Sequence, residues 1–315
     1  MDLSQASAIY YGETGVSAVY LGSTQIWSNT PHDYSQDYFT IVSLEDNNII
    51  GLKASNANLL KTISISTDGG TTWTNKESST AGTTLATLNT GDKLLVKGSN
   101  IAYGNVNGYY NCFTSTGNFN IEGNSMSLTY ADNFINKLTM STYRFNYLFY
   151  NCDKLVSAKN FILPATTLRD YCYQYMFQGC ISLTTAPELP ATTLAGWCYR
   201  YMFNGCISLT TAPELPATTL TSGCYQYMFN GCTSLTTAPE LPATTLTSGC
   251  YYHMFYGCKK LDYIKCLATD ISAANCIVDW VNNVAASGTF VKNASMSSWT
   301  TGANGIPSGW SIVNA

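Results

Sequence analysis

The sequence Cys-Tyr-Gln-Tyr-Met-Phe-Asn-Gly-Cys-Thr-Ser-Leu-Thr-Thr-Ala-Pro-Glu-Leu-Pro-Ala-Thr-Thr-Leu, residues 224–246, represents a unit that recurs every 26 residues. Its final hexapeptide, Leu-Pro-Ala-Thr-Thr-Leu, begins at residues 163, 189, 215 and 241. A partial copy precedes these four and a degenerate copy follows them. A unit of this size cannot bury its apolar side chains alone, so the copies are expected to stack as a solenoid in which equivalent residues form columns.

Within one copy, the apolar residues predict a short helix followed by a short strand. Cys224, Met228 and Cys232 recur at i, i+4 and i+8, which indicates one face of a helix. Gly231 then occupies the position of a helix C-cap with positive φ, and Asn151 replaces this glycine in the first copy. The segment from Leu235 to Pro239 predicts a strand that ends at the proline. The predicted solenoid is therefore of α/β type.

The order of an aromatic residue, a Gly-Cys pair and a leucine, seen at Phe229, Gly231-Cys232 and Leu235, resembles the BspA-like class of leucine-rich repeats. The resemblance covers about residues 145–288, although the proline-bracketed copies are longer than the commoner form. Known members are mostly bacterial surface adhesins and related virion proteins. The resemblance therefore implies adhesion, in a protein of the kind found in the tail or head fibres of gut bacteriophages.

The remaining chain predicts three further parts, so that the fold class is mixed but mainly β. Residues 8–27 alternate around glycine-rich turns, which indicates a β-hairpin or three-strand meander in an N-terminal module, 1–30. This module resembles short segments at the ends of phage tail and fibre proteins, which implies attachment to other virion proteins. Residues 31–139 predict a small β-sandwich. The solenoid spans 140–288, and a strand-rich cap, 289–315, covers its last coil.

The composition excludes several functions. Charged residues make up 11% of the chain and the net charge is −4, so the surface is expected to be neutral, polar and aromatic. Nucleic-acid binding is not expected, because phosphate neutralisation requires many basic residues. No apolar run is long enough for a membrane span, and the first residues lack a secretory-signal pattern. A protein released by cell lysis, as virions are, would need neither.

Residues Ser66 to Trp73 match the Asp-box pattern, in which the Asp and Gly shape a hairpin turn and the Trp packs beneath it. Sialidase-like propellers carry several such boxes, whereas this chain has one. All three arginines of the chain lie outside the predicted sandwich, which argues against an arginine triad. We interpret the box as structural. A glycan hydrolase is the enzymatic alternative, and it requires two carboxylates about 5–9 Å apart.

No catalytic, cofactor or metal site is predicted. The twelve cysteines are expected to be buried, reduced thiols that act as small apolar groups. Neither His32 nor His253 adjoins a nucleophile motif. The column of Glu188, Glu214 and Glu240 is expected to be solvated, with bound calcium as the alternative.

Positions that differ between copies are expected to face solvent, including the column of Gln174, Arg200, Gln226 and Tyr252. An exposed Trp and Arg are typical of binding hot spots, although ordinary surface drift explains such variation equally simply. Two tyrosine columns are expected either to offer contact area to a ligand or to cover the seams between coils. The candidate ligand-binding residues are Tyr171, Trp197, Tyr173, Tyr199, Arg200, Tyr225, Tyr251 and Tyr252.

These observations predict a non-enzymatic virion protein, an external fibre or appendage that binds a host-surface glycan or protein. A homotrimer is one expected assembly, because fibres are commonly trimeric. Two alternatives stay open at this point. The first is a bacterial cell-surface adhesin of the BspA-like class. The second is an architectural decoration protein that binds no receptor.

Overall fold

The computed structural model describes residues 10–11, 14–15, 18–21, 24–28, 32–297 and 299–315. The chain forms two compact units, Met1–Tyr34 and Ser35–Ala315. In the first unit two antiparallel strand pairs form, which agrees with the hairpin alternative and not with a three-strand meander. Their strands are β1 (Tyr10–Tyr11), β2 (Thr14–Gly15), β3 (Ala18–Leu21) and β4 (Thr24–Ser28).

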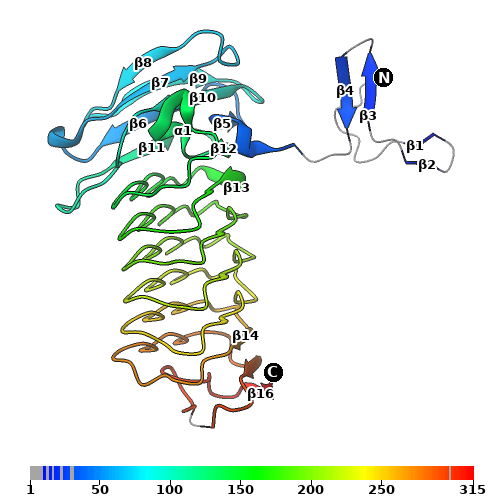
Figure 1. Cartoon of the computed structure of the whole chain (residues 1–315), viewed down its shortest axis with the longest axis vertical. Coiled ribbons are helices and arrows are strands. Elements are labelled where there is room, and N and C mark those ends of the chain that lie inside the picture. Colours follow the sequence, from blue (N-terminus) through cyan, green and yellow to red (C-terminus); the bar gives the residue numbers. More distant parts are fainter. Residues whose placement is uncertain (1–9, 12–13, 16–17, 22–23, 29–31, 298) are drawn as a thin grey trace. The chain divides into compact units, whose positions relative to one another are not determined.

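The second unit begins with two sheets (Figure 1). One has six strands in the order β13-β12-β5-β10-β7-β8, and the other has three in the order β11-β6-β9. The strands are β5 (Phe39–Ser43), β6 (Asn48–Ala54), β7 (Thr62–Ser66), β8 (Thr74–Glu77), β9 (Thr83–Leu88), β10 (Lys93–Gly98), β11 (Asn111–Ser115), β12 (Phe119–Asn124) and β13 (Leu155–Ile162). Alternate residues of β10 are buried, as expected of a strand with one face on a core. The rings of Phe39 in β5 and Phe113 in β11 lie 5.3 Å apart, so the two sheets share that core.

The helices are few and short. The one α-helix among the described residues is α1 (Ser127–Tyr130), and three 3-10 turns accompany it: η1 (Tyr34–Gln36), η2 (Ala57–Leu59) and η3 (Ala131–Asn133). The buried Ser127 hydroxyl accepts the Phe39 N–H and donates to the Val96 carbonyl, which fixes α1 against β5 and β10. The fold is therefore mainly β.

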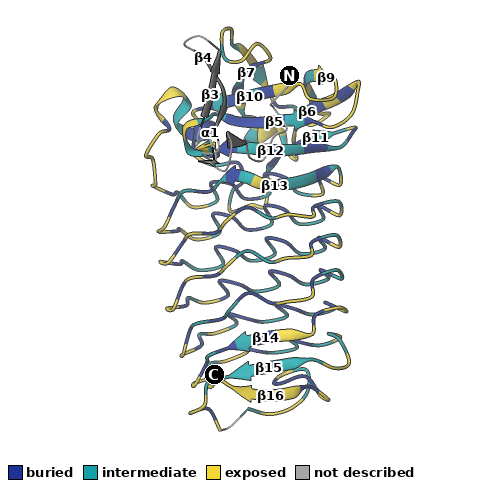
Figure 2. Cartoon of the chain, turned by 90° about the vertical axis from the view of Figure 1, so that its right-hand side faces the viewer, coloured by how far each residue is buried: buried dark blue, intermediate teal, exposed yellow. Residues whose placement is uncertain are grey.

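Residues 140–288 form a stack of coils, one for each copy of the repeat, which we call the coil stack (Figures 1 and 2). Equivalent residues lie side by side: Ser157 is bridged to Thr185, which continues through Thr211 and Thr237 to Tyr263. The rings of Phe177 and its equivalents are likewise stacked 5.5–5.7 Å apart. The expectation that residues one repeat apart form columns is confirmed.

The predicted short helix in each copy is wrong. The segment from Tyr171 to Cys180 is instead a run of consecutive turns, in which backbone N–H groups alternate between two acceptors. The Met176 N–H donates to the Tyr173 carbonyl three residues back, whereas the Phe177 N–H donates to Met202 in the next coil. Because half of the donors serve the neighbouring coil, the continuous ladder of an α-helix cannot form.

This run of consecutive turns, which we call the turn run, explains why the sequence pattern resembled that of a helix. Every fourth residue has positive φ: Tyr171 at 58°, Tyr175 at 59° and Gly179 at 74°. A four-residue period places Cys172 and Met176 on the same side, as the helix prediction did, and both are buried. Gly179 and its equivalents do have positive φ, but as part of the turn run and not as helix caps.

The predicted strand in each copy is reduced to a single bridged residue, as at Thr237. Pro239 follows two residues later and has no N–H to donate, so the ladder stops there. Among the described residues, full strands form in this column only where these prolines are missing, in β13, in β14 (Tyr263–Cys266) and in the two strands that follow it.

The C-terminal residues continue the stack. Strands β14, β15 (Thr289–Lys292) and β16 (Ser311–Asn314) form a parallel sheet in which each strand belongs to a successive coil. The Trp280 ring is stacked on Tyr251 and on Trp299, with centroids 6.0 and 5.9 Å away, and its indole N–H donates to the Gly305 carbonyl at 2.8 Å. The ranges expected to be separate parts, 31–139, 140–288 and 289–315, thus share one continuous hydrophobic core.

Candidate ligand-binding site

Four of the predicted binding residues are not on the surface. The rings of Tyr173, Tyr199, Tyr225 and Tyr251 are each 1% exposed and stack on one another inside the coils. Their predicted role in binding is therefore wrong. The physical reason is the turn run, which directs two adjacent residues inward in every four, such as Cys172 and Tyr173, where a helix would direct only one of them fully inward. Burial raises the pKa of these phenols well above the ordinary value.

A second aromatic column lies half-buried along the outer side of the turn runs. It consists of Tyr110, Tyr147, Tyr175, Tyr201, Tyr227 and His253, whose successive ring centroids are 4.4–4.8 Å apart. Two predicted site residues contact this column: Arg200 lies 4.9 Å above the Tyr201 ring, and Tyr252 lies 5.4 Å from the Tyr227 ring. Each inner ring of the column, from Tyr147 to Tyr227, lies between two neighbouring rings, so this column seals the seams between coils.

A third aromatic column stops midway along the stack. Tyr143, Tyr171 and Trp197 are stacked with centroids 4.9 and 5.3 Å apart and planes within 3° of parallel. The next two copies have glycine in this column, Gly223 and Gly249, with φ of 60° and 61°. Trp197 is therefore a partly exposed ring with Tyr171 on one face and, among the described residues, no ring on the other.

A hollow of about 220 Å³ lies where the missing rings would be. A Cβ atom on Gly223 would lie 2.6 Å from the Trp197 ring, so glycine allows the indole to cover this position. A Cβ on Gly249 would meet only the Gln226 amide, at 3.9 Å, which shows that the space above Gly249 is open. The hollow is lined by two predicted site residues, Trp197 and Tyr252, together with Ser222, Gly223, Gln226, Ser248, Gly249 and Asn275.

The lining of the hollow is polar but uncharged. Among the described residues, the side chains of Gln226, Ser248 and Asn275 have no hydrogen-bond partner, and neither does the indole N–H of Trp197. Ser222 donates weakly to the Ser248 carbonyl at 3.3 Å. An aromatic face beside several free hydroxyl and amide groups is the combination that orients a small polar ligand.

The sequence predicted two residues of this hollow, Trp197 and Tyr252, but not the other residues that line it. Only the structure places Gly223 and Gly249 in the lining of the hollow beside Trp197. Asn275 gave no signal. The expectation that the Gln174 column faces solvent is wrong for Gln174 itself, which is buried and accepts the Asn146 amide at 3.0 Å.

A separate groove of about 350 Å³ lies on the proline side of the coils. Its walls are mostly apolar and include Pro187, Pro190 and Pro213, with the exposed Glu188 and Glu214 beside them. The third member of the glutamate column, Glu240, forms an ion pair with Lys265 at 3.0 Å. A lysine of the chain thus supplies the cation at that end of the column. In the described part of the chain, no three His, Cys, Asp or Glu side chains are grouped so that they could hold a metal ion.

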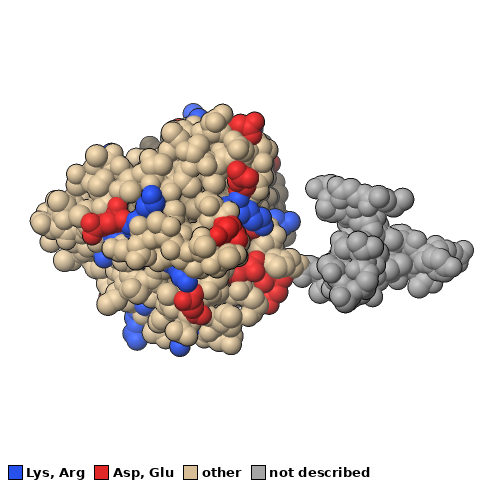
Figure 3. Space-filling view, turned by 90° about the horizontal axis from the view of Figure 1, so that it is seen from above, with Lys and Arg blue, Asp and Glu red and all other residues tan. Residues whose placement is uncertain are grey.

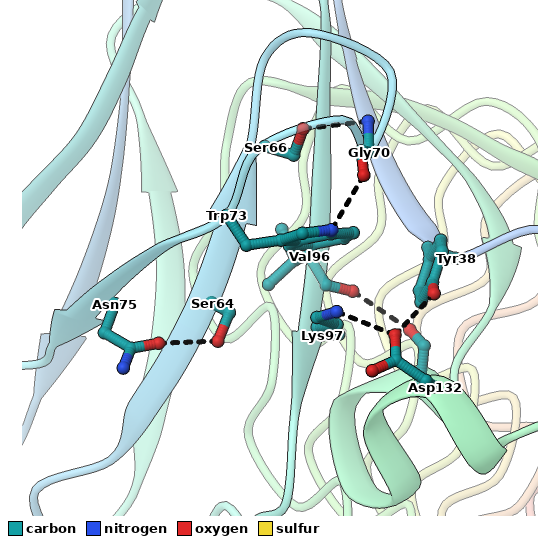
Figure 4. A network of polar contacts seen from close by, with 10 residues as sticks. Tyr38, Ser64, Ser66, Gly70, Trp73, Asn75, Val96, Lys97 and Asp132 are labelled. Carbon is teal, nitrogen blue, oxygen red and sulfur yellow. Dashed lines mark hydrogen bonds and ion pairs between the residues drawn. The ribbon is translucent and has the colours of Figure 1, made fainter.

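The Asp box forms a structural turn between β7 and β8, as interpreted from the sequence (Figure 4). Asp68 accepts hydrogen bonds from Thr72 and Ser66, which lower the pKa of its carboxyl to about 2. The Trp73 indole donates to the Gly70 carbonyl at 2.9 Å, and the Lys97 ammonium lies 3.9 Å from the Trp73 ring. The polar groups of this turn are therefore engaged with one another.

Lys97 also joins a surface cluster beside the box (Figure 4). Its ammonium lies 2.7 Å from the Asp132 carboxylate, which also accepts the Tyr38 hydroxyl. Burial and this hydrogen bond raise the pKa of Tyr38 to about 12. Each charged group in the cluster is paired, which is consistent with a structural role.

All twelve cysteines are free and buried, as expected. In the coil stack one thiol of each full copy donates to a carbonyl of the preceding coil, as Cys206 does to Phe177 at 3.1 Å. Charged residues are sparse and of mixed sign on the face shown in Figure 3. Of the helices that the structure describes, none is long and apolar enough to cross a bilayer.

The chain matches no protein-family model, no curated protein and no solved structure.

Proposed function

We propose that this chain is a non-enzymatic structural protein of a bacteriophage particle, a tail or head fibre or appendage, whose coil stack adheres to a host-surface glycan or protein. The proposed adhesion rests on one observation, the hollow beside Trp197. The buried columns of the stack repeat almost unchanged, whereas the column through Trp197, Gly223 and Gly249 varies and leaves free polar groups. Packing alone requires no such variation.

The coil stack is a solenoid related to the BspA-like leucine-rich repeats. Support comes from Phe229, Gly231 and Leu235, which keep the spacing of that class, and from the stacking of equivalent residues. The turn run takes the place of the expected helix, so the relationship rests on the sequence pattern and on the stacked architecture. The two sheets ahead of it, with their shared core, correspond to the small β-sandwich.

Residues 1–30 attach the protein to other virion proteins in this proposal. The segment through Val19 and Trp27 carries the resemblance to the ends of phage fibre proteins, and β3 and β4 pair within it. About 20 residues cannot make an independent core, so this module packs on a partner, either another virion protein or further copies in a homotrimer.

The experiment is immunogold labelling of purified phage particles and of bacterial envelopes, with antibody against residues 140–288. Labelling at the periphery of the particles supports the proposal. Labelling of bacterial envelopes alone would replace it with a bacterial adhesin. Particles that label, but whose purified protein binds no host cells, would indicate an architectural decoration protein.

A further inference from the structure

We infer that the hollow beside Trp197 binds one uncharged sugar ring against the indole, so that the receptor is a neutral glycan. This inference deepens the proposed function and rests on it. It commits to a glycan, whereas a protein receptor becomes an outcome of the test.

The fixed indole of Trp197 supports an aromatic contact with a sugar ring. One face of the indole is covered by Tyr171 at 5.3 Å with parallel planes, so the indole is held in one orientation before any ligand arrives. The face of an aromatic ring carries partial negative charge and attracts the weakly positive C–H groups on one side of a sugar. The indole lies over Gly223, so a ligand ring would contact the part of the indole that borders the hollow above Gly249.

The size and polarity of the hollow match a single sugar unit. Its volume of about 220 Å³ is below the 300–1,000 Å³ typical of sites for drug-sized ligands. Ser248, Gln226 and Asn275, which line the hollow together with Trp197, supply free donors and acceptors. Hydroxyl groups, which a sugar presents around its rim, can both donate to and accept from such groups.

The lining of the hollow is uncharged, which favours a neutral sugar over an anionic one. None of the residues that line the hollow is acidic or basic. A sialic acid or another anionic sugar would place a carboxylate there without a cationic partner, which is unfavourable in a partly desolvated site. An apolar protein side chain would leave the surrounding amide and hydroxyl groups without partners. A neutral hexose or N-acetylhexosamine avoids both penalties.

Gly249 provides a way to fill the hollow without removing any contact. The equivalent residue in the next coil is Asn275, which adopts φ of 57°, close to the 61° of Gly249. The substitution Gly249→Asn therefore places a side chain in the hollow on a backbone that the neighbouring coil already shows to be compatible with Asn.

A matched control exists in the same coil. Gly257 also has positive φ, 73°, and Asn151 occupies its column in the first copy with φ of 53°. A Cβ on Gly257 would meet only the Gly231 backbone, at 3.9 Å. Gly257→Asn thus makes the same chemical change in the same coil, away from the hollow.

The test uses the full chain on an array of neutral and sialylated oligosaccharides and in adhesion to host cells. We expect binding to neutral glycans that falls at least about tenfold in Trp197→Ala and in Gly249→Asn, and that is unchanged in Gly257→Asn. Trp197→Phe, which keeps an aromatic face, should retain part of the affinity. Thermal unfolding of each variant controls for loss of fold.

Three results would overturn the inference: no binding to any neutral glycan, a preference for sialylated glycans, or equal binding by Trp197→Ala, Gly249→Asn and the wild type. Adhesion to host cells that survives periodate oxidation of their glycans but is lost after protease treatment would indicate a protein receptor. That result leaves the proposed function intact. Failure of the proposed function itself would appear in the particle labelling, which does not depend on this hollow.

Discussion

The coil stack and the two sheets that precede it bury their side chains in different ways. In the stack, a ring such as Phe229 lies between copies of itself, 5.6 and 5.7 Å from Phe203 and Phe255. In the sheets, Phe39 meets rings that are not its equivalents at steep angles: Phe113 at 59°, and Phe149 of the first coil at 62°. Repetition fixes each interior column of the stack, because every coil must match both neighbours. Variation is then confined to the outside, and the hollow beside Trp197 lies in such a varied column.

The largest expected difference between the two regions is in alkaline stability. Eleven of the twelve cysteines lie between residues 152 and 276, and one, Cys112, lies in the sheets. Burial raises the pKa of the Cys258 thiol to about 12, and it raises that of Cys206 well above the ordinary value. Because the folded pKa exceeds the unfolded one, the stabilisation is complete below about pH 8.5 and is lost as the pH rises toward 12.

Each thiol that must stay protonated costs about 1.4 kcal/mol per pH unit above its unfolded pKa, so several kcal/mol are lost from the stack by about pH 10. Urea unfolding at pH 7 and at pH 10 can be monitored by hydrogen exchange, with the exchange rates corrected for the faster intrinsic exchange of amides at higher pH. At pH 10 the coils should open at lower urea concentrations than the sheets. Cys112→Ala serves as the control: it removes the one buried thiol of the sheets, whose pKa burial raises to about 11, and it should leave the alkaline opening of the coils unchanged. Equal loss in both regions would contradict the comparison.

The second prediction compares two buried phenylalanines. Phe229→Ala in the stack and Phe113→Ala in the sheets should each destabilise the protein by about 3–5 kcal/mol, because both rings are fully buried. The extent of the damage should differ. A coil contacts only its neighbours, so faster hydrogen exchange after Phe229→Ala should be confined to adjacent coils. Phe113→Ala should loosen the sheets together, and a uniform response to both variants would show that the regions unfold as one.

The smallest expected effect is one that the two regions share. Gly257 in the stack and Gly91 in the turn before β10 both have positive φ, 73° and 86°. Replacement of either by alanine should cost about 1–2 kcal/mol, because an L side chain is strained in this conformation. Urea midpoints at constant slope measure the cost. A much larger loss at Gly257 would indicate close packing between glycines of adjacent coils, which the 3.9 Å contacts do not predict.

The buried columns could be read from the sequence, but the local backbone could not. Cys224, Met228 and Cys232 fit a helix with 3.6 residues per turn almost as well as a run of turns with a period of four. The two differ at the adjacent residue, Tyr225, which the turn run buries and a helix would leave partly outside. Distinguishing them requires knowing that alternate N–H groups donate to the next coil, and no single copy contains that information.

The same division applies to the strands and to the site. Prolines at fixed positions explain why Thr237 makes only one bridge, and the sequence indicated that stop. The varied columns named Trp197 and Tyr252 as site residues, since those positions differ between copies. The sequence did not distinguish them from the buried Tyr199 and Tyr225, because whether a tyrosine points inward or outward depends on the turn geometry.

Periodicity along the chain was enough to establish the interval of stacking, the residues that pack beneath one another and the neutral, aromatic character of the surface. Such properties depend on residue type and spacing, and these are local. Which aromatic ring borders the hollow, and which glycines lie beside it, was set by hydrogen bonds between neighbouring coils. Those bonds exist only after the coils have come together, so the site beside Trp197 is a property of the assembled stack.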